Sequence, residues 1–207
     1  MSFADVSEAE AFLAAHPEVR SIEAFLIDAN GVPRGKLLHR DELLAAYRNG
    51  RPLPASILGL TINGEDVPET GLVWDVGDAD CWTFPLAGSL TLQPWRTKPT
   101  GQVQLAMHPE KGLPAAVADP RRVLQRVLAQ LAADGLHPVM AVELEFYLVD
   151  RERTVEGHAQ PPRQPLSGRR ETKTQINSMA DLAEYSAVLR AIGEAARVQE
   201  LPAGTVL

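Results

Sequence analysis

The sequence predicts an α+β fold in two parts, a first domain over residues 1–111 built on a mostly antiparallel sheet and a second over 112–207 that opens with a long helix. Three observations support it. Residues 21–40 alternate around Asn30-Gly31, a dipeptide typical of tight hairpin turns. In the second part the apolar period lengthens to that of an amphipathic helix. Further short strands are predicted in the first part at 71–76, 89–95 and 102–108.

Two short helices flank the predicted hairpin. The first spans residues 7–15, and the second begins at Asp41 and is ended by Asn49-Gly50. Residues 51–70 follow, interrupted by proline and glycine, and predict a long loop. Long loops within compact domains often carry function, so this one is a candidate binding region.

The second part begins with the clearest helix of the chain. Asp119 is a suitable N-cap, and Pro120 occupies the first turn, where its missing N–H costs nothing. Gly135 ends the helix, and a strand is predicted next, over 138–150. The helix carries one apolar stripe, made of Val123, Leu124, Val127, Leu128, Leu131 and Ala132.

The remainder of the second part lacks the elements that a closed domain needs. A polar stretch over 150–177 predicts an exposed loop, and a long helix follows over 178–201, with Ser178 and Asp181 at capping-box spacing. The last residues, "LPAGTVL", begin an apolar run that has no partner strand. Because one strand and two helices cannot close a core, we expect the truncated beginning of a larger domain.

Composition excludes several classes of protein. The chain has 207 residues, 45% of them hydrophobic, so a packed core is expected rather than global disorder. Its 20 basic and 27 acidic residues give a net charge of −7, and no basic tract indicates nucleic-acid binding. No apolar run reaches the roughly 20 residues that span a bilayer, and no signal peptide is evident. The single cysteine, Cys81, is expected to pack, and the chain fits a reducing cytoplasm with no membrane partner.

The strand predicted over 138–150 contains a pair of carboxylates. Side chains alternate along a strand, so Glu143 and Glu145 project from one face, about 6.5–7 Å apart at the backbone. Two like charges at this spacing repel unless a cation lies near them, and Mg²⁺ prefers such oxygen ligands. The alternative is a solvated sheet face, which also carries charged residues.

The order of the motifs resembles that of the glutamine synthetase family. The stretch "DPRRVLQRVLAQLAADGLHPVMAVELEFYLVD" is similar to the helix and glutamate-bearing strand that enter its catalytic domain. "LIDANGVPRGKLL" resembles the hairpin of its N-terminal β-grasp domain, "PASILG" its serine-isoleucine loop and "LTLQPW" a later strand. The resemblance implies a β-grasp-like domain over 1–111 and the incomplete start of an α/β catalytic domain over 112–207.

The resemblance implies an ATP-dependent ligase. In such enzymes the γ-carboxylate of glutamate is phosphorylated, and ammonia or an amine attacks the acyl phosphate, with ATP as co-substrate and Mg²⁺ or Mn²⁺ as metal. Transferred by position, Glu145 would ligate the metal near glutamate and Glu143 the metal near the phosphates. Family members form double rings of identical subunits, so a homo-oligomer is expected of the full-length protein.

The serine-isoleucine loop departs from the ammonia-using members, in which it begins with an aspartate. Ungapped alignment places Leu53 there, and a leucine can neither attract ammonium nor accept its proton. The loop instead resembles the γ-glutamylpolyamine synthetase-like branch. Leu53, which suits the methylene chain of an organic amine, and Ser56 are the candidate substrate-binding residues. Asp66 reaches a second acidic family position after a one-residue gap and is the candidate catalytic residue, with a solvated loop carboxylate as the alternative.

The family's other site residues and its nucleotide site would follow Leu207. Two carboxylates are too few to hold two divalent ions, so we expect no glutamate- and amine-dependent ATP hydrolysis from the 207-residue chain by itself. A competing hypothesis is a non-catalytic subunit or regulatory fragment that binds full-length family members. A degraded product without function is a third.

Several other residues have two interpretations. Arg34 and Lys36 could face a phosphate or a neighbouring subunit, or simply cover an exposed hairpin. The adjacent Arg169 and Arg170 could recruit an anionic ligand. Three tryptophans near predicted strands are expected in the core, namely Trp74, Trp82 and Trp95.

Overall fold

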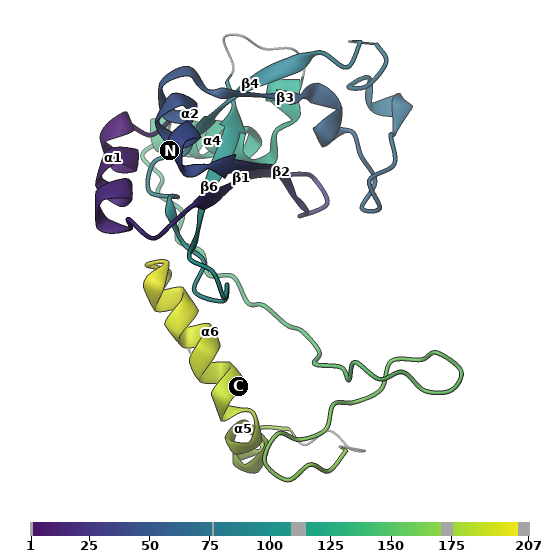
Figure 1. Cartoon of the computed structure of the whole chain (residues 1–207). Helices are drawn as coiled ribbons and strands as arrows, with labels where there is room; N and C mark the ends of the chain where they lie inside the picture. Colours follow the sequence, from purple (N-terminus) through teal and green to yellow (C-terminus); the bar gives the residue numbers. More distant parts are fainter. Residues whose placement is uncertain (1, 76, 109–114, 171–175, 203–207) are drawn as a thin grey trace. The chain divides into compact units, whose positions relative to one another are not determined.

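The computed structural model describes residues 2–75, 77–108, 115–170 and 176–202 (Figure 1). The chain separates into two compact units, unit 1 (Met1–Pro138) and unit 2 (Val139–Leu207). The boundary predicted at residue 111 lies outside the described residues, and the helix that follows it belongs to unit 1. No helix of the described part is long and apolar enough to cross a membrane.

Unit 1 is organised around a six-stranded mixed sheet. Its main path runs in the order β2-β1-β6-β4-β3, and β5 pairs with β6 beside it. Strands β1 and β6 run parallel, and the other neighbours are antiparallel. The predicted α+β class and mostly antiparallel sheet are therefore confirmed. The strands are β1 (Ser21–Ile27), β2 (Pro33–His39), β3 (Arg51–Pro54), β4 (Asp80–Pro85), β5 (Thr91–Leu92) and β6 (Thr100–Met107).

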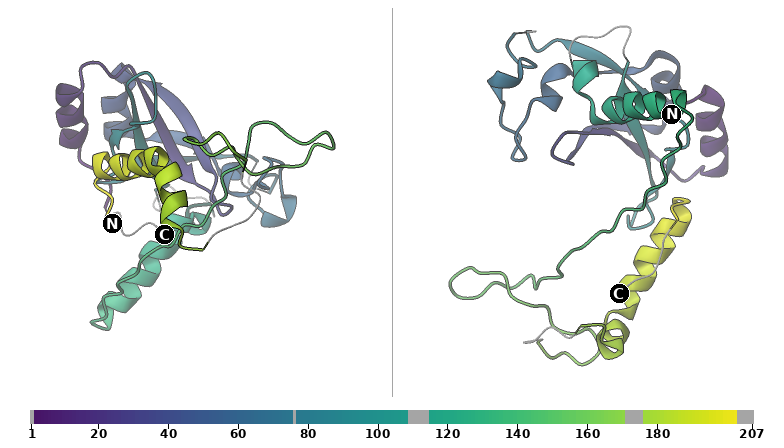
Figure 2. Two further views of the ribbon diagram at one scale, coloured as in Figure 1. Left: turned by 90° about the horizontal axis from the view of Figure 1, so that it is seen from below. Right: turned by 180° about the vertical axis from the view of Figure 1, so that it is seen from behind.

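The helices predicted for unit 1 are present, and most of them begin and end within two residues of the predicted positions. Asp5 caps the first helix by accepting a hydrogen bond from Ser7 N at 2.9 Å. The first two helices lie at the end of unit 1 opposite the β3–β4 connection (Figures 1 and 2). The α-helices are α1 (Val6–Ala15), α2 (Leu43–Asn49), α3 (Ala115–Ala118) and α4 (Pro120–Ala133), and the 3-10 helices are η1 (Arg40–Glu42), η2 (Ala55–Leu58) and η3 (Pro68–Thr70).

Strand β1 contributes three side chains to the core. Its side chains alternate, so that Ile22, Ala24 and Leu26 are buried while their neighbours are half-buried. A glycine allows β2 to pair closely with it. A Cβ added to Gly35 would lie 2.0 Å from the carbonyl oxygen of Ala24, a distance that no real side chain tolerates.

The predicted hairpin is present, but its turn is longer than expected. Ile27 pairs with Pro33, so the loop contains the five residues 28–32 rather than a two-residue turn. Gly31 adopts φ +78°, the left-handed conformation that glycine accepts readily. The extra residues follow from Asp28, whose side chain organises the loop as described below.

The strand predicted over 71–76 is wrong. The described residues 71–75 form turns and bends, whereas β3 and β4, which the sequence analysis did not predict, complete the sheet. Strand β3 contains Pro52 and Pro54 and lies at the edge of the sheet, where a missing N–H is tolerated.

The predicted burial of the tryptophans is also wrong, because they are exposed by 69% (Trp74), 37% (Trp82) and 58% (Trp95).

The helix predicted after residue 119 is confirmed. Asp119, which is 1% exposed, caps α4 by accepting from Arg121 N at 2.9 Å. Its other oxygen accepts from Met107 N at 2.9 Å and so ties the helix to the end of β6. No described side chain of α4 is buried, and the first half of its apolar stripe, Val123, Leu124 and Val127, is exposed.

Unit 2 corrects two predictions. The single helix expected over 178–201 is two helices, α5 (Met179–Glu184) and α6 (Ser186–Val198), separated at Tyr185, with Ser178 Oγ accepting from Asp181 N at 3.3 Å. The strand predicted over 138–150 is wrong, because that segment has no regular secondary structure (Figure 1). A strand forms only when its backbone groups find partners, and no described residue pairs with 139–149. The apolar run after residue 202 lies outside the described residues.

Candidate functional site

The connection between β3 and β4 concentrates acidic side chains. No lysine, arginine or histidine occurs between Pro52 and Trp95. Within the described part of the chain, none of the acids in this connection forms an ion pair. Their summed charge creates a negative potential that attracts cations. Five exposed carboxylates of the connection contribute, those of Glu65, Asp66, Glu69, Asp75 and Asp78, together with that of Asp80, the first residue of β4.

Residues 59–67 of this connection fold back on themselves and form a compact loop. The N–H of Val67 donates to the carbonyl oxygen of Gly59 at 2.8 Å. Leu60 and Asp66 form an isolated antiparallel bridge. The backbone of Asp66 therefore has a defined position, and its side chain is exposed.

The two other candidate residues of this region differ in accessibility. Leu53 lies in β3 opposite Cys81 of β4, and its side chain is 2% exposed within the core. In this arrangement it offers no surface to a substrate, so its predicted substrate contact rests on sequence alignment alone. Ser56 is half-buried in η2, where its carbonyl oxygen accepts from Gly59 N at 2.7 Å.

The carboxylates predicted as metal ligands lie in the extended segment of unit 2. Glu143 and Glu145 are exposed, and so are the apolar residues between and beside them, Val142 by 84% and Leu144 by 81%. Carboxylate oxygens suit Mg²⁺ or Mn²⁺, but no three His, Cys, Asp or Glu side chains of the described residues come together. The type of donor therefore fits a hard divalent ion, and the number of donors does not.

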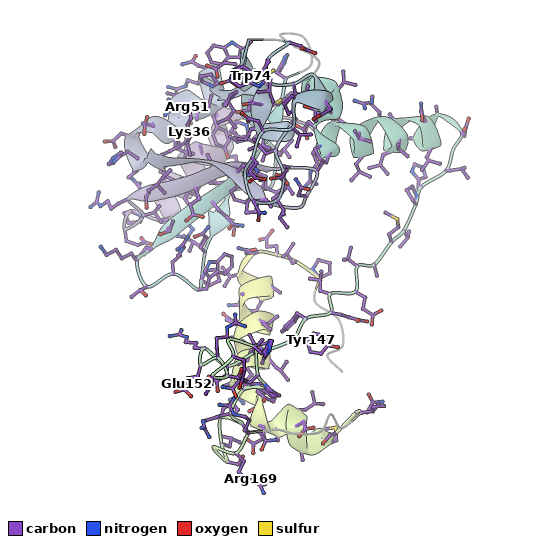
Figure 3. The ribbon with its side chains drawn as sticks, turned by 90° about the vertical axis from the view of Figure 1, so that its right-hand side faces the viewer. Lys36, Arg51, Trp74, Tyr147, Glu152 and Arg169 are labelled. Atoms are coloured by element: carbon purple, nitrogen blue, oxygen red, sulfur yellow. The ribbon has the colours of Figure 1, made fainter. Side chains whose placement is uncertain are left out.

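The polar loop of unit 2 is organised by a partly buried ion pair. Arg170 lies 2.8 Å from Asp150. A hydrogen bond from the N–H of Glu152, together with the charge of Arg170, holds the pKa of the Asp150 carboxyl below its usual value. Of the two arginines considered for anion binding, Arg170 is thus engaged within the unit, whereas Arg169 is exposed (Figure 3).

Sequence analysis missed the role of Asp28. Its carboxylate accepts from Asn30 N at 2.8 Å, from Val32 N at 2.9 Å and from Arg34 Nε at 2.6 Å. Burial by itself raises the pKa of Asp28, but the hydrogen bonds from Arg34, Val32 and Asn30 outweigh it and hold the pKa below its usual value. Asp28 accepts from the N–H two residues later, which is an Asx turn, and an Asp just before an Asn-Gly turn is a signal that could have identified it.

The two basic residues of the hairpin donate hydrogen bonds within unit 1, Arg34 from a mostly buried position and Lys36 from an exposed one. Arg34 is 16% exposed and forms an ion pair with Asp28. It therefore neither simply covers an exposed hairpin nor is free to bind a phosphate. Lys36 Nζ donates to the carbonyl oxygen of Pro52 at 3.3 Å, which links the two edge strands β2 and β3. Figure 3 accordingly shows Lys36 beside Arg51, the neighbour of Pro52.

Comparison with known proteins identifies the family. Residues 117–206 match the family model described as "Glutamine synthetase, catalytic domain". Over 196 residues, 95% of this chain, the sequence is 39% identical to γ-glutamylputrescine synthetase PuuA of Escherichia coli (strain K12). The chain belongs to the glutamine synthetase family. The matched region of this family begins within α3 and includes Glu143 and Glu145.

The structural comparison agrees at the level of the fold. The solved structure of apo GmaS without ligand superposes with a TM-score of 0.58 and 18% identity, covering 90% of this chain and 39% of that one. The chain spans 41% of the length of the E. coli relative.

Proposed function

We propose that this glutamine synthetase family chain is the N-terminal part of an ATP-dependent ligase that joins the γ-carboxylate of glutamate to an organic amine. The observation that carries the proposal is the 39% identity to a γ-glutamylputrescine synthetase over 95% of the chain. In this proposal residues 1–111 correspond to a β-grasp-like domain, and residues 112–207 begin the catalytic domain. The family match from residue 117 onward supports that division.

The choice of an organic amine over ammonia rests on the β3–β4 connection. Its five exposed carboxylates and that of Asp80 at the start of β4, without a basic residue between Pro52 and Trp95, suit an acceptor with more than one positive charge, such as a diamine. In β3, just before the connection, Leu53 supplies no carboxylate to bind or deprotonate ammonium. Asp66, exposed on the loop 59–67, is the candidate acid for the amine.

Glu143 and Glu145 are proposed to supply two carboxylates of a Mg²⁺ or Mn²⁺ site. Bound metal would supply electrostatic stabilisation of the nucleotide phosphates. The described residues do not complete a set of ligands, so the chain alone should bind Mn²⁺ only weakly, with a dissociation constant of about a millimolar. An electron paramagnetic resonance titration of the wild type and of Glu143→Gln/Glu145→Gln measures this. Equal affinity in the two proteins would remove the pair from the proposed site.

A chimera tests the proposed activity. The 207-residue chain replaces the segment of E. coli γ-glutamylputrescine synthetase that it matches, and phosphate release from ATP is measured with glutamate and either 1,4-diaminobutane or ammonium. We expect turnover with the diamine well above that with ammonium. Glu145→Ala should abolish turnover, whereas Glu152→Ala, an exposed carboxylate outside the pair, should not. A folded chimera without turnover would contradict the ligase proposal, and turnover by the 207-residue chain alone would contradict the proposal that it is only a part.

Unit 2 supports a second candidate, a subunit or regulatory fragment that binds full-length relatives. The apolar side chains of 139–149 are exposed, and so are Val123, Leu124 and Val127 of the apolar stripe of α4 in unit 1. Such surfaces mark sites of association. Co-expression with a full-length relative, followed by light scattering, tests this candidate. A stable mixed complex would favour it, and a monomer that never joins the relative would exclude it.

A further inference from the structure

The tip of the β1–β2 hairpin holds the loop 59–67 through two side chains. Arg34 donates from Nη2 to the carbonyl oxygen of Thr61 at 2.9 Å. Asn30 donates from Nδ2 to the carbonyl oxygen of Leu60 at 2.8 Å. Two consecutive carbonyls of the loop are thus fixed by residues about thirty positions earlier in the chain.

Arg34 is itself held in one orientation. Its Nε donates to Asp28 at 2.6 Å, and the Asp28 side chain is 1% exposed. Asp28 is fixed in turn by two backbone N–H groups of its own loop. A guanidinium is planar, so fixing Nε also fixes the direction in which Nη2 points. A Cβ added to Gly64 would lie 3.7 Å from Nη1 of Arg34, so the guanidinium lies against the turn of the loop 59–67.

The position of Thr61 determines the backbone of the acidic residues that follow. Its N–H donates to the carbonyl oxygen of Glu65 at 2.8 Å, and its hydroxyl accepts from Glu65 N at 3.1 Å. Its carbonyl oxygen, besides accepting from Arg34, accepts from Gly64 N at 3.0 Å. Asp66 is the next residue along the chain and pairs with Leu60. A displacement of Leu60 and Thr61 therefore moves the carboxylates of Glu65 and Asp66.

We propose that Arg34 is a positioning residue for the amine acceptor: anchored by buried Asp28, it fixes the loop 59–67 so that Glu65 and Asp66 face the amine in one arrangement. This inference rests on the proposed function, because it assigns the loop to the amine. It requires the fork geometry of arginine rather than its charge alone. Lysine could keep the ion pair with Asp28, but it could not also reach Thr61 with a second, fixed donor.

The experiment uses the 207-residue chain and compares the wild type with Arg34→Lys, Arg34→Gln and a control, Arg48→Gln. The control removes one arginine from an exposed pair, with Glu10, that does not touch the loop. Amide exchange is followed at Thr61, Gly64 and Val67, whose N–H groups are hydrogen-bonded within the loop, and in strands β1 and β6. Amide chemical shifts of the loop are then recorded during titration with 1,4-diaminobutane at constant ionic strength.

We expect both Arg34 variants to accelerate exchange of the three loop amides by about tenfold or more, with β1 and β6 unchanged. They should also weaken the diamine-induced shifts, and Arg48→Gln should resemble the wild type. Wild-type loop exchange in either Arg34 variant would overturn the proposal. Faster loop exchange with unchanged diamine shifts would overturn it too, since Arg34 would then be structural only. If the wild type itself shows no diamine shifts, the assignment of the loop to an amine fails, and the positioning role fails with it.

Discussion

Strand β1 and the segment 139–149 have similar sequence patterns and different structures. In both, the side chains alternate between two faces, and one face is apolar throughout. In β1 this face consists of Ile22, Ala24 and Leu26. In unit 1 that face is buried, because β1 lies between β2 and β6 and helices pack nearby. In unit 2 the equivalent residues, such as Val142 and Leu144, are more than 80% exposed, and no described residue pairs with their backbone.

The difference shows what an alternating pattern specifies. Alternation determines which side chains share a face if a strand forms, but hydrogen bonding to a neighbour determines whether it forms. Strand β1 has two neighbours within about eighty residues of sequence, β2 next to it and β6 after the acidic connection. The segment 139–149 has no neighbour among the described residues. Substitutions at matched positions should therefore have large effects in unit 1 and small effects in unit 2.

The largest contrast is expected between two glycines. In Gly35→Ala the new Cβ would overlap the carbonyl oxygen of Ala24, which should separate β2 from β1 and cost more than about 4 kcal/mol of unfolding free energy. In Gly193→Ala, within α6, the new Cβ meets nothing within 4 Å. Because alanine has a higher helix propensity than glycine, the helix should be stabilised by about 0.5–1 kcal/mol. Circular dichroism during thermal unfolding measures both effects. A Gly35→Ala protein that unfolds like the wild type would show that the sheet register differs.

Truncation of an apolar residue gives the next contrast. Ile22→Ala empties a fully buried position and should destabilise unit 1 by about 2–5 kcal/mol. Val142→Ala removes a side chain that is 84% exposed and should change the free energy by less than about 0.5 kcal/mol. Urea denaturation followed by fluorescence gives both values. A large loss in Val142→Ala would mean that 139–149 is packed in solution, against a partner or a second copy.

Local signals in the sequence were sufficient for part of the fold. Caps and turn residues identified α1, α2 and α4, and the alternation around Asn30-Gly31 identified the hairpin, because these elements are determined by neighbours in sequence. Strands β3 and β4 were missed, since β3 is short and contains two prolines and gains its place only by pairing across the sheet. The strand over 138–150 was predicted wrongly for the converse reason, a strong local pattern without a partner.

Only the chemical types of the candidate site residues could be predicted from the sequence. The sequence pointed to Glu143 and Glu145 as oxygen ligands and to Asp66 as a loop acid, and their roles stay predictions. It could not show that Leu53 is buried or that Arg34 points inward, because the first depends on the pairing of β3 with β4 and the second on the contact of β2 with the loop 59–67. Such contacts join residues far apart in the chain and leave no periodic signal.

The smallest contrast compares two ion pairs, one in each unit. Asp28→Asn removes the charge that faces Arg34 in a nearly buried pair and should cost about 1–3 kcal/mol. Glu194→Gln disrupts the exposed pair with Arg197 in α6 and should leave the unfolding transition unchanged. The Asp28–Arg34 pair also makes stability depend on pH. Because the folded-state pKa of Asp28 lies below its unfolded value of about 3.9, its stabilisation is fully present above that pH and is lost as the pH falls through the folded pKa. Unfolding free energies measured from pH 6 down to acid should therefore fall less steeply in Asp28→Asn than in the wild type. Parallel curves for the two proteins would mean that Asp28 is not ionised against Arg34, and the fixed orientation of the guanidinium would lose its support.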